Sequence, residues 1–181
     1  MKPAFAALAA ALLLEGCGGR AVSDLPVKLG RPYAVRGVTY TPAADPGYDM
    51  LGYASWYGNE SGRRTANGET FRAKWITAAH TTLPLPTYVE VTALDTGRRI
   101  VVRVNDRGPF SGRARIIDLS RGAAQELGVR AAGHVAVRVR AVAPAEADRK
   151  RLRRGKPARA LPPEREPILR NLRAQLAAGG S

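Results

Sequence analysis

The feature that most constrains the fold is a series of short strand-like segments between Tyr53 and Val142. In several of them Val alternates with Arg or Glu, which places apolar side chains on one face and charged side chains on the other. Stretches rich in Gly, Pro and Asn separate the segments, which read YASWYG, TYVEVTAL, RRIVVRV, ARIIDL and HVAVRVRAV. Half-buried strands joined by turns of this kind predict a compact β-barrel.

One short helix is predicted inside this β-rich region. Ser120 is a suitable N-cap, and most residues from Arg121 to Leu127 are good helix formers. Gly128 stands where a left-handed residue commonly ends a helix. We therefore expect a mainly β domain over residues 52–142 that contains a single helix.

The first 16 residues have the pattern of an export signal. Lys2 is followed by an apolar stretch from Ala4 to Leu14, which is shorter than the roughly 20 residues needed to span a bilayer. The stretch ends in Leu14-Glu15-Gly16-Cys17, which resembles the lipobox of bacterial lipoproteins although Glu15 departs from it. We expect Cys17 to be lipidated, with a plain secretory peptide as the alternative. Because Gly18 and not Asp follows the Cys, the outer membrane is favoured over the inner membrane.

Two extensions flank the predicted barrel. Residues 17–51 are polar and rich in turn formers, and predict a tether with at most one edge hairpin from Tyr33 to Tyr40. Residues 143–181 are rich in Ala, Pro and Arg, which predicts a largely disordered basic tail. Near its end Ile168, Leu172 and Leu176 are spaced four apart. A basic amphipathic helix on a membrane surface is therefore the alternative to a solvated tail.

Composition excludes several classes of function. The chain has 181 residues and a formal net charge of +14, which attracts it to anionic polymers and membranes. One Cys and two His cannot build a disulfide framework or a clustered zinc site, so we expect no metal and no cofactor. Nucleic-acid binding through the Arg-rich tail is disfavoured by the export signal.

Three polar residues lie beside turn formers and are candidates for function. In RRTANGETF the Asn67-Gly68 pair predicts a tight turn that presents Glu69 at the barrel mouth. His80 ends a stretch of small residues, and Asp106 directly follows a strand, where binding residues are commonly held. Each also has a structural interpretation, because Asn and Asp in turns often bond only their own backbone. Composition alone therefore reaches only a basic, exported β-barrel.

Two further titratable residues are predicted to be structural. Asp118 stands just before the helix N-cap in RIIDLS, where a carboxylate stabilises a helix start or joins a barrel network. His134 begins the strand-like segment HVAVRV. We expect neither residue to take part in chemistry.

Longer blocks of the sequence carry a family resemblance. ASWYG, GRRTANGETF, TAAHTTLPLPTYVEVT, RRIVVRVNDRGPF and RIIDLSRGAAQELGV occur in this order and extend over the predicted barrel domain, residues 52–142. They resemble the successive signature blocks of the rare lipoprotein A family. The resemblance implies a six-stranded double-psi β-barrel similar to barwin and expansins, with flexible extensions. It also implies a monomeric lytic transglycosylase that acts on peptidoglycan glycan strands lacking stem peptides.

The resemblance also implies a set of site residues. The catalytic ones are Asp106, Glu69 and His80, and the substrate-binding ones are Trp56, Tyr57, Asn105 and Arg107. Family members commonly have an aromatic residue and His before Gly-Arg, whereas this chain has Asn59-Glu60-Ser61-Gly62. The substitution removes a ring on which a sugar could stack.

By this resemblance, Asp106 would protonate the glycosidic oxygen that leaves N-acetylmuramic acid and then deprotonate the 6-hydroxyl of the same sugar. The product is a 1,6-anhydro end, and a partly desolvated barrel rim would raise the pKa of the acid. Glu69 would orient the sugar or stabilise its positive charge, and His80 would position Asp106 or the sugar. Hydrolysis by two carboxylates is the nearest alternative chemistry. The rival from another class is a non-catalytic wall-binding module in which Trp56, Tyr57 and Tyr88 stack on sugars.

Overall fold

The computed structural model describes residues 21–58, 62–112 and 114–179. Cys17 and the predicted signal peptide lie outside these ranges, as do Asn59, Glu60 and Ser61. The elements in chain order are β1 Tyr33–Val35, β2 Val38–Tyr40, β3 Asp49–Tyr57, β4 Thr77–Ala79, β5 Thr87–Ala93, β6 Arg99–Asp106, β7 Arg115–Ser120, α1 Arg121–Leu127, β8 Val135–Ala141, α2 Glu146–Leu152 and α3 Glu166–Ala177.

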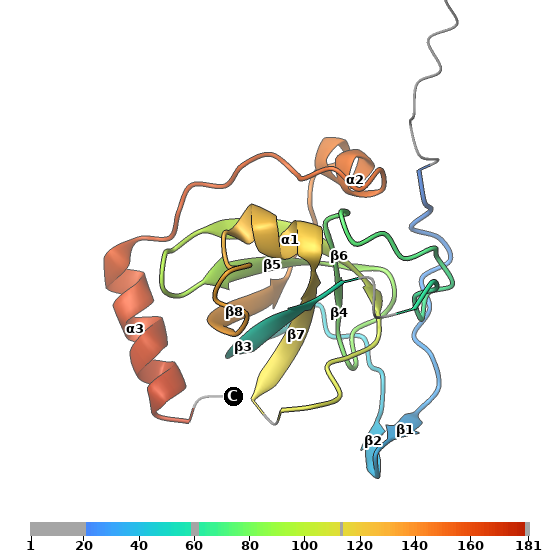
Figure 1. Cartoon of the computed structure of the whole chain (residues 1–181), viewed down its shortest axis with the longest axis horizontal. Coiled ribbons are helices and arrows are strands. Elements are labelled where there is room, and N and C mark those ends of the chain that lie inside the picture. Colours follow the sequence, from blue (N-terminus) through green and yellow to red (C-terminus); the bar gives the residue numbers. More distant parts are fainter. Residues whose placement is uncertain (1–20, 59–61, 113, 180–181) are drawn as a thin grey trace, which may run out of the picture.

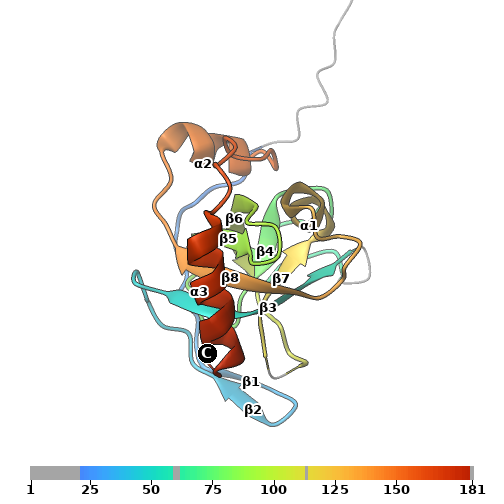
Figure 2. The same ribbon diagram turned by 90° about the vertical axis from the view of Figure 1, so that its left-hand side faces the viewer.

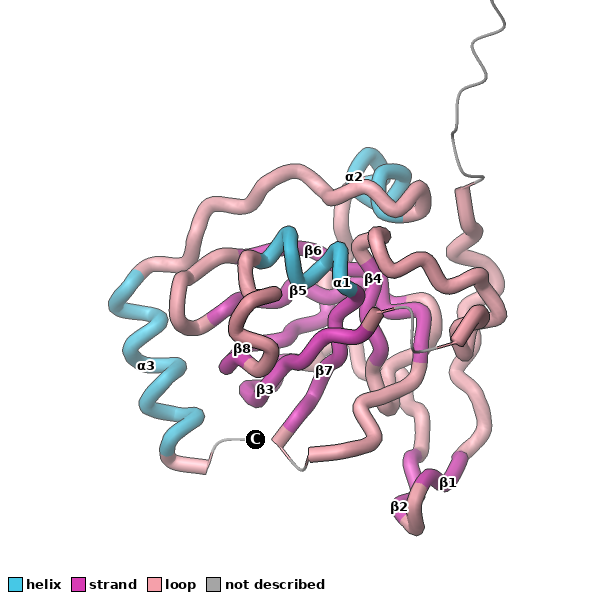
Figure 3. Tube along the Cα trace, in the orientation of Figure 1, coloured by secondary structure: helices cyan, strands magenta, loops and turns pink. Residues whose placement is uncertain are grey.

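Six strands close into a barrel in the order β3-β7-β4-β6-β5-β8, around which the helices lie on the outside (Figures 1 and 3). The pairs β3–β7 and β4–β6 are parallel, and the other four pairs are antiparallel. Closure leaves no exposed strand edge in the barrel. The predicted six-stranded double-psi β-barrel is thereby confirmed.

Alternation along the strands explains the core, with one exception. Val102 and Val104 of β6 are fully buried inside the barrel, as the period of two predicts. Arg103 lies between them on the opposite face and is also completely buried. The expectation that the charged face of this strand meets solvent is therefore wrong at Arg103, because other parts of the chain cover it.

The predicted helix is present as α1, with both predicted caps. The Ser120 side chain accepts the backbone N–H of Ala123, and Gly128 has a φ of 81° in the left-handed region. Ala123, Ala124 and Leu127 are buried against the barrel. The local sequence signals and the packing of α1 agree.

The N-terminal extension contains the predicted hairpin and is attached to the barrel. β1 and β2 pair in antiparallel fashion and project from the barrel wall (Figure 1). Lys28 and Leu85 exchange two backbone hydrogen bonds of 2.7 and 2.8 Å, and the Tyr33 hydroxyl donates to the Thr81 carbonyl at 2.7 Å. β3 begins at Asp49, inside the predicted tether, so the barrel starts earlier than expected.

The prediction that residues 143–181 are largely disordered is wrong for the part of the tail that the structure describes. α2 contributes the fully buried Leu152 to the main core, and α3 lies along the barrel (Figure 2). Leu169 and Leu172 of α3 are buried against Leu94. The composition of the tail does not reveal that its apolar residues pack against the barrel. The apolar face of α3, which the sequence analysis considered as a membrane-binding face, instead contacts barrel residues. No helix among the described residues is long and apolar enough to cross a bilayer.

Candidate functional site

Two aspartates meet at one end of the barrel, on either side of a small residue. Asp106 ends β6 and Asp118 lies in β7, and both pair in register with Ala79 at the end of β4. Residues that pair across neighbouring strands project from the same face, so the two carboxylates flank the Ala79 methyl group. A pocket of about 310 Å³ lies there. It is lined by Tyr57, Arg64, Ala79, Asp106, Arg107, Gly108, Phe110 and Asp118.

The Asp106 carboxyl group has an unequal environment at its two oxygens. Oδ1 accepts the backbone N–H groups of Ala66 and Arg107, both at 2.8 Å. Burial raises the pKa of Asp106, and these two hydrogen bonds and the Arg107 charge offset the rise only in part. A carboxyl group with a raised pKa in a pocket is suited to act as a general acid.

Asp118 is held from the other side of the pocket. Its Oδ1 accepts the Ser55 hydroxyl at 2.6 Å, and its Oδ2 lies 3.6 Å from the Arg115 guanidinium. Arg115 also donates to the Ser55 hydroxyl oxygen at 2.9 Å. The predicted role in a barrel network is confirmed, but the same carboxylate also lines the pocket opposite Asp106. Sequence analysis missed this second role, because no local signal tells that β7 and β6 flank β4.

Tyr57, predicted to bind substrate, lines the pocket together with Asp106 and Asp118. Burial raises the pKa of Tyr57, and the negative charges of Asp106 and Asp118 raise it further. The ring stacks on Phe71 with centroids 5.0 Å apart. Among the described residues the buried hydroxyl has no hydrogen-bond partner. Since buried polar groups are normally paired, this hydroxyl is suited to bond a ligand oxygen.

Arg107 and Gly108 shape the pocket floor. The Arg107 guanidinium donates to the carbonyl oxygens of Leu83 at 2.5 Å, Leu29 at 3.0 Å and His80 at 3.2 Å. It therefore joins two backbone segments, the loop of residues 80–83 and the segment at Leu29, beside Asp106. Gly108 has a φ of 137°, which L side chains rarely adopt, and any Cβ there would lie 3.6 Å from the Ala79 Cβ.

His80, predicted to be catalytic, does not line the pocket. Its side chain is buried, and Nδ1 accepts the backbone N–H groups of Thr82 at 3.2 Å and Leu83 at 3.1 Å. Burial lowers the pKa of His80 to about 4, and the Arg107 charge lowers it further, so the ring is neutral at pH 7. The His80 backbone N–H donates to the Asp106 carbonyl at 3.0 Å. The geometry suits the predicted positioning of Asp106.

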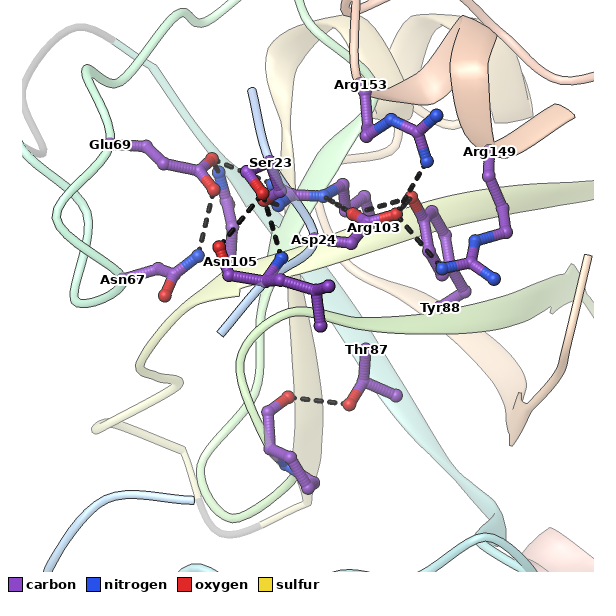
Figure 4. Close-up of polar contacts among 12 residues, drawn as sticks. Ser23, Asp24, Asn67, Glu69, Thr87, Tyr88, Arg103, Asn105, Arg149 and Arg153 are labelled. Carbon is purple, nitrogen blue, oxygen red and sulfur yellow. Dashed lines mark hydrogen bonds and ion pairs between the residues drawn. The ribbon is translucent and has the colours of Figure 1, made fainter. Parts of the chain in front are cut away.

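Glu69 also lies outside the pocket lining, in a polar network shown in Figure 4. Oε2 accepts Arg103 Nη1 and Asn105 Nδ2, and Oε1 accepts Asn67 Nδ2, all at 2.8 Å. The predicted turn is present, with Gly68 at a φ of 86°. Glu69 therefore has charged and amide partners from the barrel, and is not presented freely at the mouth as expected.

Asn105, Trp56 and Tyr88, the other residues predicted to bind sugars, do not line the pocket. Asn105 is buried with its amide on Glu69, and its Oδ1 has no hydrogen-bond partner among the described residues. Trp56 precedes Tyr57 in β3 and so points to the opposite face; its Nε1 donates to the Arg130 carbonyl at 3.1 Å. Tyr88 is only 8% exposed and donates to Asp24, so its ring is not available for stacking on a sugar.

The closed topology and the pocket that Asp106 and Asp118 line define a double-psi β-barrel protein with two carboxyl groups at one end of the barrel. Residues 49–139, half of the chain, match the family model described as lytic transglycolase. The chain belongs to this family.

Several curated relatives share high sequence identity with the chain. The endolytic peptidoglycan transglycosylase RlpA of Pseudomonas aeruginosa is 52% identical over 117 residues, which are 64% of this chain and 34% of the relative. The Neisseria meningitidis protein of the same name is 44% identical over 124 residues, which are 67% of this chain and 52% of the relative. The chain thus spans about a third to a half of these curated relatives. The solved Streptomyces papain inhibitor is 26% identical, with a TM-score of 0.46, over 56% of this chain and all of that one.

Proposed function

We propose that the chain is an endolytic lytic transglycosylase that cleaves peptidoglycan glycan strands, with naked strands preferred and Asp106 as general acid. The observation that carries the proposal is a half-buried carboxyl group with a raised pKa that faces a second carboxylate across a pocket. Relatives at 44–52% identity are named endolytic peptidoglycan transglycosylases, which supports the same chemistry for this chain.

The proposed reaction proceeds through one acid and one intramolecular nucleophile. Because Oδ1 of Asp106 already accepts two backbone N–H groups, the proton to be transferred resides on Oδ2. Oδ2 gives this proton to the glycosidic oxygen as the bond to C1 of N-acetylmuramic acid breaks. The 6-hydroxyl of the same sugar then bonds to C1 and returns its proton to Asp106. The products are a free 4-hydroxyl and a 1,6-anhydro end, without consumption of water.

Asp118 and Tyr57 complete the proposed chemistry. The Asp118 carboxylate faces the developing positive charge at C1 and stabilises it electrostatically. The Tyr57 hydroxyl donates to a sugar oxygen. If Asp118 instead activated a water molecule, the two carboxylates would carry out hydrolysis and leave a reducing end. The nature of the new ends therefore distinguishes the two reactions.

We further propose that the protein is an exported, monomeric lipoprotein whose Cys17 carries the acyl anchor in the outer membrane. The support is the lipobox-like Leu14–Cys17 segment after an apolar stretch of signal-peptide length. Mass spectrometry of the mature N-terminal peptide would show a diacylglyceryl group on Cys17. A Cys17→Ala variant that still fractionates with outer membranes would contradict the anchor.

The deciding experiment is product analysis by mass spectrometry on amidase-stripped peptidoglycan. Wild type, Asp106→Asn and the matched control Asp95→Asn, an exposed carboxyl in the turn after β5, would be compared. We expect anhydromuramyl ends from wild type and Asp95→Asn, and none from Asp106→Asn. Reducing ends would establish a hydrolase. Binding to the strands without any fragments from folded wild-type protein would establish the non-catalytic module.

A further inference from the structure

Arg103 is a buried charge that connects two distant parts of the chain (Figure 4). It lies in β6 three positions before Asp106 and has no exposed surface. Nε donates to Asp24 at 3.0 Å, Nη1 to Glu69 at 2.8 Å, and Nη2 to the Ser23 carbonyl at 2.7 Å. A fully buried guanidinium is tolerated only when carboxylates and carbonyls satisfy it in this way.

Asp24 is in turn held by the C-terminal extension. It accepts the Tyr88 hydroxyl at 2.9 Å and the guanidinium groups of Arg153 at 2.9 Å and Arg149 at 3.3 Å. Burial would raise the pKa of Asp24, but hydrogen bonds from Arg153, Arg103 and Tyr88 hold it below its usual value. The segment before the barrel and α2 after it therefore meet on one charged side chain.

The other end of this network reaches the pocket. Glu69 is bonded to Arg103 and Asn105, and the Asn67 backbone N–H donates to the Asn105 carbonyl at 3.1 Å. These contacts attach the turn of residues 65–69 to β6. The same turn supplies the Ala66 N–H that donates to Asp106 Oδ1 at 2.8 Å.

We propose that Asp24, Arg103 and Glu69 form a positioning chain that holds the 65–69 turn and, through the Ala66 N–H, controls how readily Asp106 gives up its proton. The segment before the barrel is then part of the catalytic unit and not a passive tether. This inference rests on the proposed role of Asp106 as acid. Glu69 acts here through the turn and does not touch the sugar.

The hydrogen bond from the Ala66 N–H to Asp106 determines the direction in which the pKa of Asp106 changes. Ala66 N–H stabilises the ionised form of Asp106, so its loss raises the pKa of Asp106 beyond the rise that burial already causes. The other charged or titratable groups at the pocket are Arg64, Arg107, Tyr57 and Asp118, and all of them remain in the variants below. A general acid works while protonated, so the alkaline limb of the pH–rate profile moves to higher pH.

The test measures the Asp106 carboxyl directly by ¹³C NMR titration and, in parallel, the pH profile of strand cleavage. Asp24→Asn keeps the shape of the side chain and removes the charge that orients Arg103. Asp148→Asn is the matched control. Asp148 lies on α2, as Arg149 does, and makes an ion pair with Arg159 at 3.1 Å. It makes no hydrogen bond or ion pair with Asp24, Arg103 or Glu69. We expect Asp24→Asn alone to raise the Asp106 pKa, to shift the alkaline limb equally, and to lower kcat about tenfold with KM changed less than twofold.

Two further variants keep the proposal testable if Asp24→Asn does not fold. Glu69→Gln breaks the chain one step nearer the pocket. Ala66→Pro removes the N–H donor itself at the second position of the turn closed by Gly68 N–H and the Thr65 carbonyl, where Pro is favoured. Both should raise the Asp106 pKa, with the larger shift for Ala66→Pro.

An unchanged Asp106 titration in folded Asp24→Asn or Glu69→Gln would overturn the positioning chain, as would an equal shift in Asp148→Asn. The NMR readout does not need turnover, so it separates this inference from the proposed function. A protein without cleavage activity in which Asp24→Asn still shifts the Asp106 titration would refute the transglycosylase and retain the chain of contacts.

Discussion

Two clusters of charged residues share strand β6, and they differ in how many hydrogen bonds and ion pairs their carboxyl groups receive. Around Arg103, the carboxylates of Asp24 and Glu69 receive hydrogen bonds from guanidinium, amide and hydroxyl groups. Around Asp106, burial raises the carboxyl pKa and the Tyr57 hydroxyl lacks a partner among the described residues. The first cluster stabilises the fold, whereas the second retains unmet interactions that a substrate can satisfy.

Among the variants that test this difference between the two clusters, the largest expected effect is the loss of cleavage activity in Asp106→Asn. Asp106→Asn removes the transferable proton and should lower kcat/KM about 10²–10⁴-fold. Thermal unfolding should show no loss of stability, because the amide removes a carboxylate that is costly to ionise. The exposed Asp95→Asn serves as control for both measurements. Retention of most activity by Asp106→Asn would move the acid to another residue.

The second-largest expected effect is a loss of stability when the cluster around Arg103 is changed. Arg103→Met fills a similar volume but leaves Asp24 and Glu69 buried without their shared cation. The free energy of unfolding in urea should fall by about 3–5 kcal/mol. Arg170→Met, on the exposed side of α3, should change it little. A loss below about 1 kcal/mol for Arg103→Met would show that the buried charge is not needed for the fold.

A smaller effect depends on pH. The folded-state pKa of Asp24 is lowered, so its contribution is fully present above the unfolded pKa and is lost as pH falls through the folded value. Asp24→Asn should therefore cost about 1.5–3 kcal/mol at pH 7, a difference that disappears in strong acid. The pKa of Asp106 is raised, so the difference for Asp106→Asn should have the opposite sign at pH 7. Urea unfolding of both variants at several pH values measures these stability differences. The same pH dependence in both variants would contradict the proposed difference between the two clusters.

The smallest effect concerns the Tyr57 hydroxyl. Tyr57→Phe removes a buried donor without a described partner, so stability should be unchanged or rise by about 1 kcal/mol. Cleavage should fall about tenfold, the equivalent of one hydrogen bond to a substrate. Tyr53→Phe, on the same strand, is the control for thermal melts and rates. A clear loss of stability in Tyr57→Phe would mean that the hydroxyl has a structural partner.

Much of the fold could be predicted because its signals are local. The alternation of Val with charged residues predicted β5, β6 and β8, and Ser120 and Gly128 predicted both ends of α1. The hairpin from Tyr33 to Tyr40 followed from the same kind of pattern. The docking of the tail could not be predicted, because Leu169 and Leu172 are buried by barrel residues far away in the sequence.

The candidate site divides in the same way. Asp106 could be recognised from its place after a strand, and Tyr57 from its family block. Asp118 could not, because its position opposite Asp106 depends on two strand pairings that meet at Ala79. Glu69 and His80 were predicted to be catalytic, but their side chains bond the scaffold and do not line the pocket.

By itself the sequence determined five of the six barrel strands, where the helix begins and ends, and which family the chain resembles, since these depend on residue types at short spacing. The short strand β4, Thr77–Ala79, was not among the segments it predicted. Tertiary structure alone decided which charges are buried. Arg103 has the alternation of an exposed residue, but it is fully buried. Asp24, from the segment before the barrel, accepts its guanidinium, and Arg149 of α2 in turn donates to Asp24. Burial and charge neutralisation are properties of the packed whole, and no local pattern encodes them.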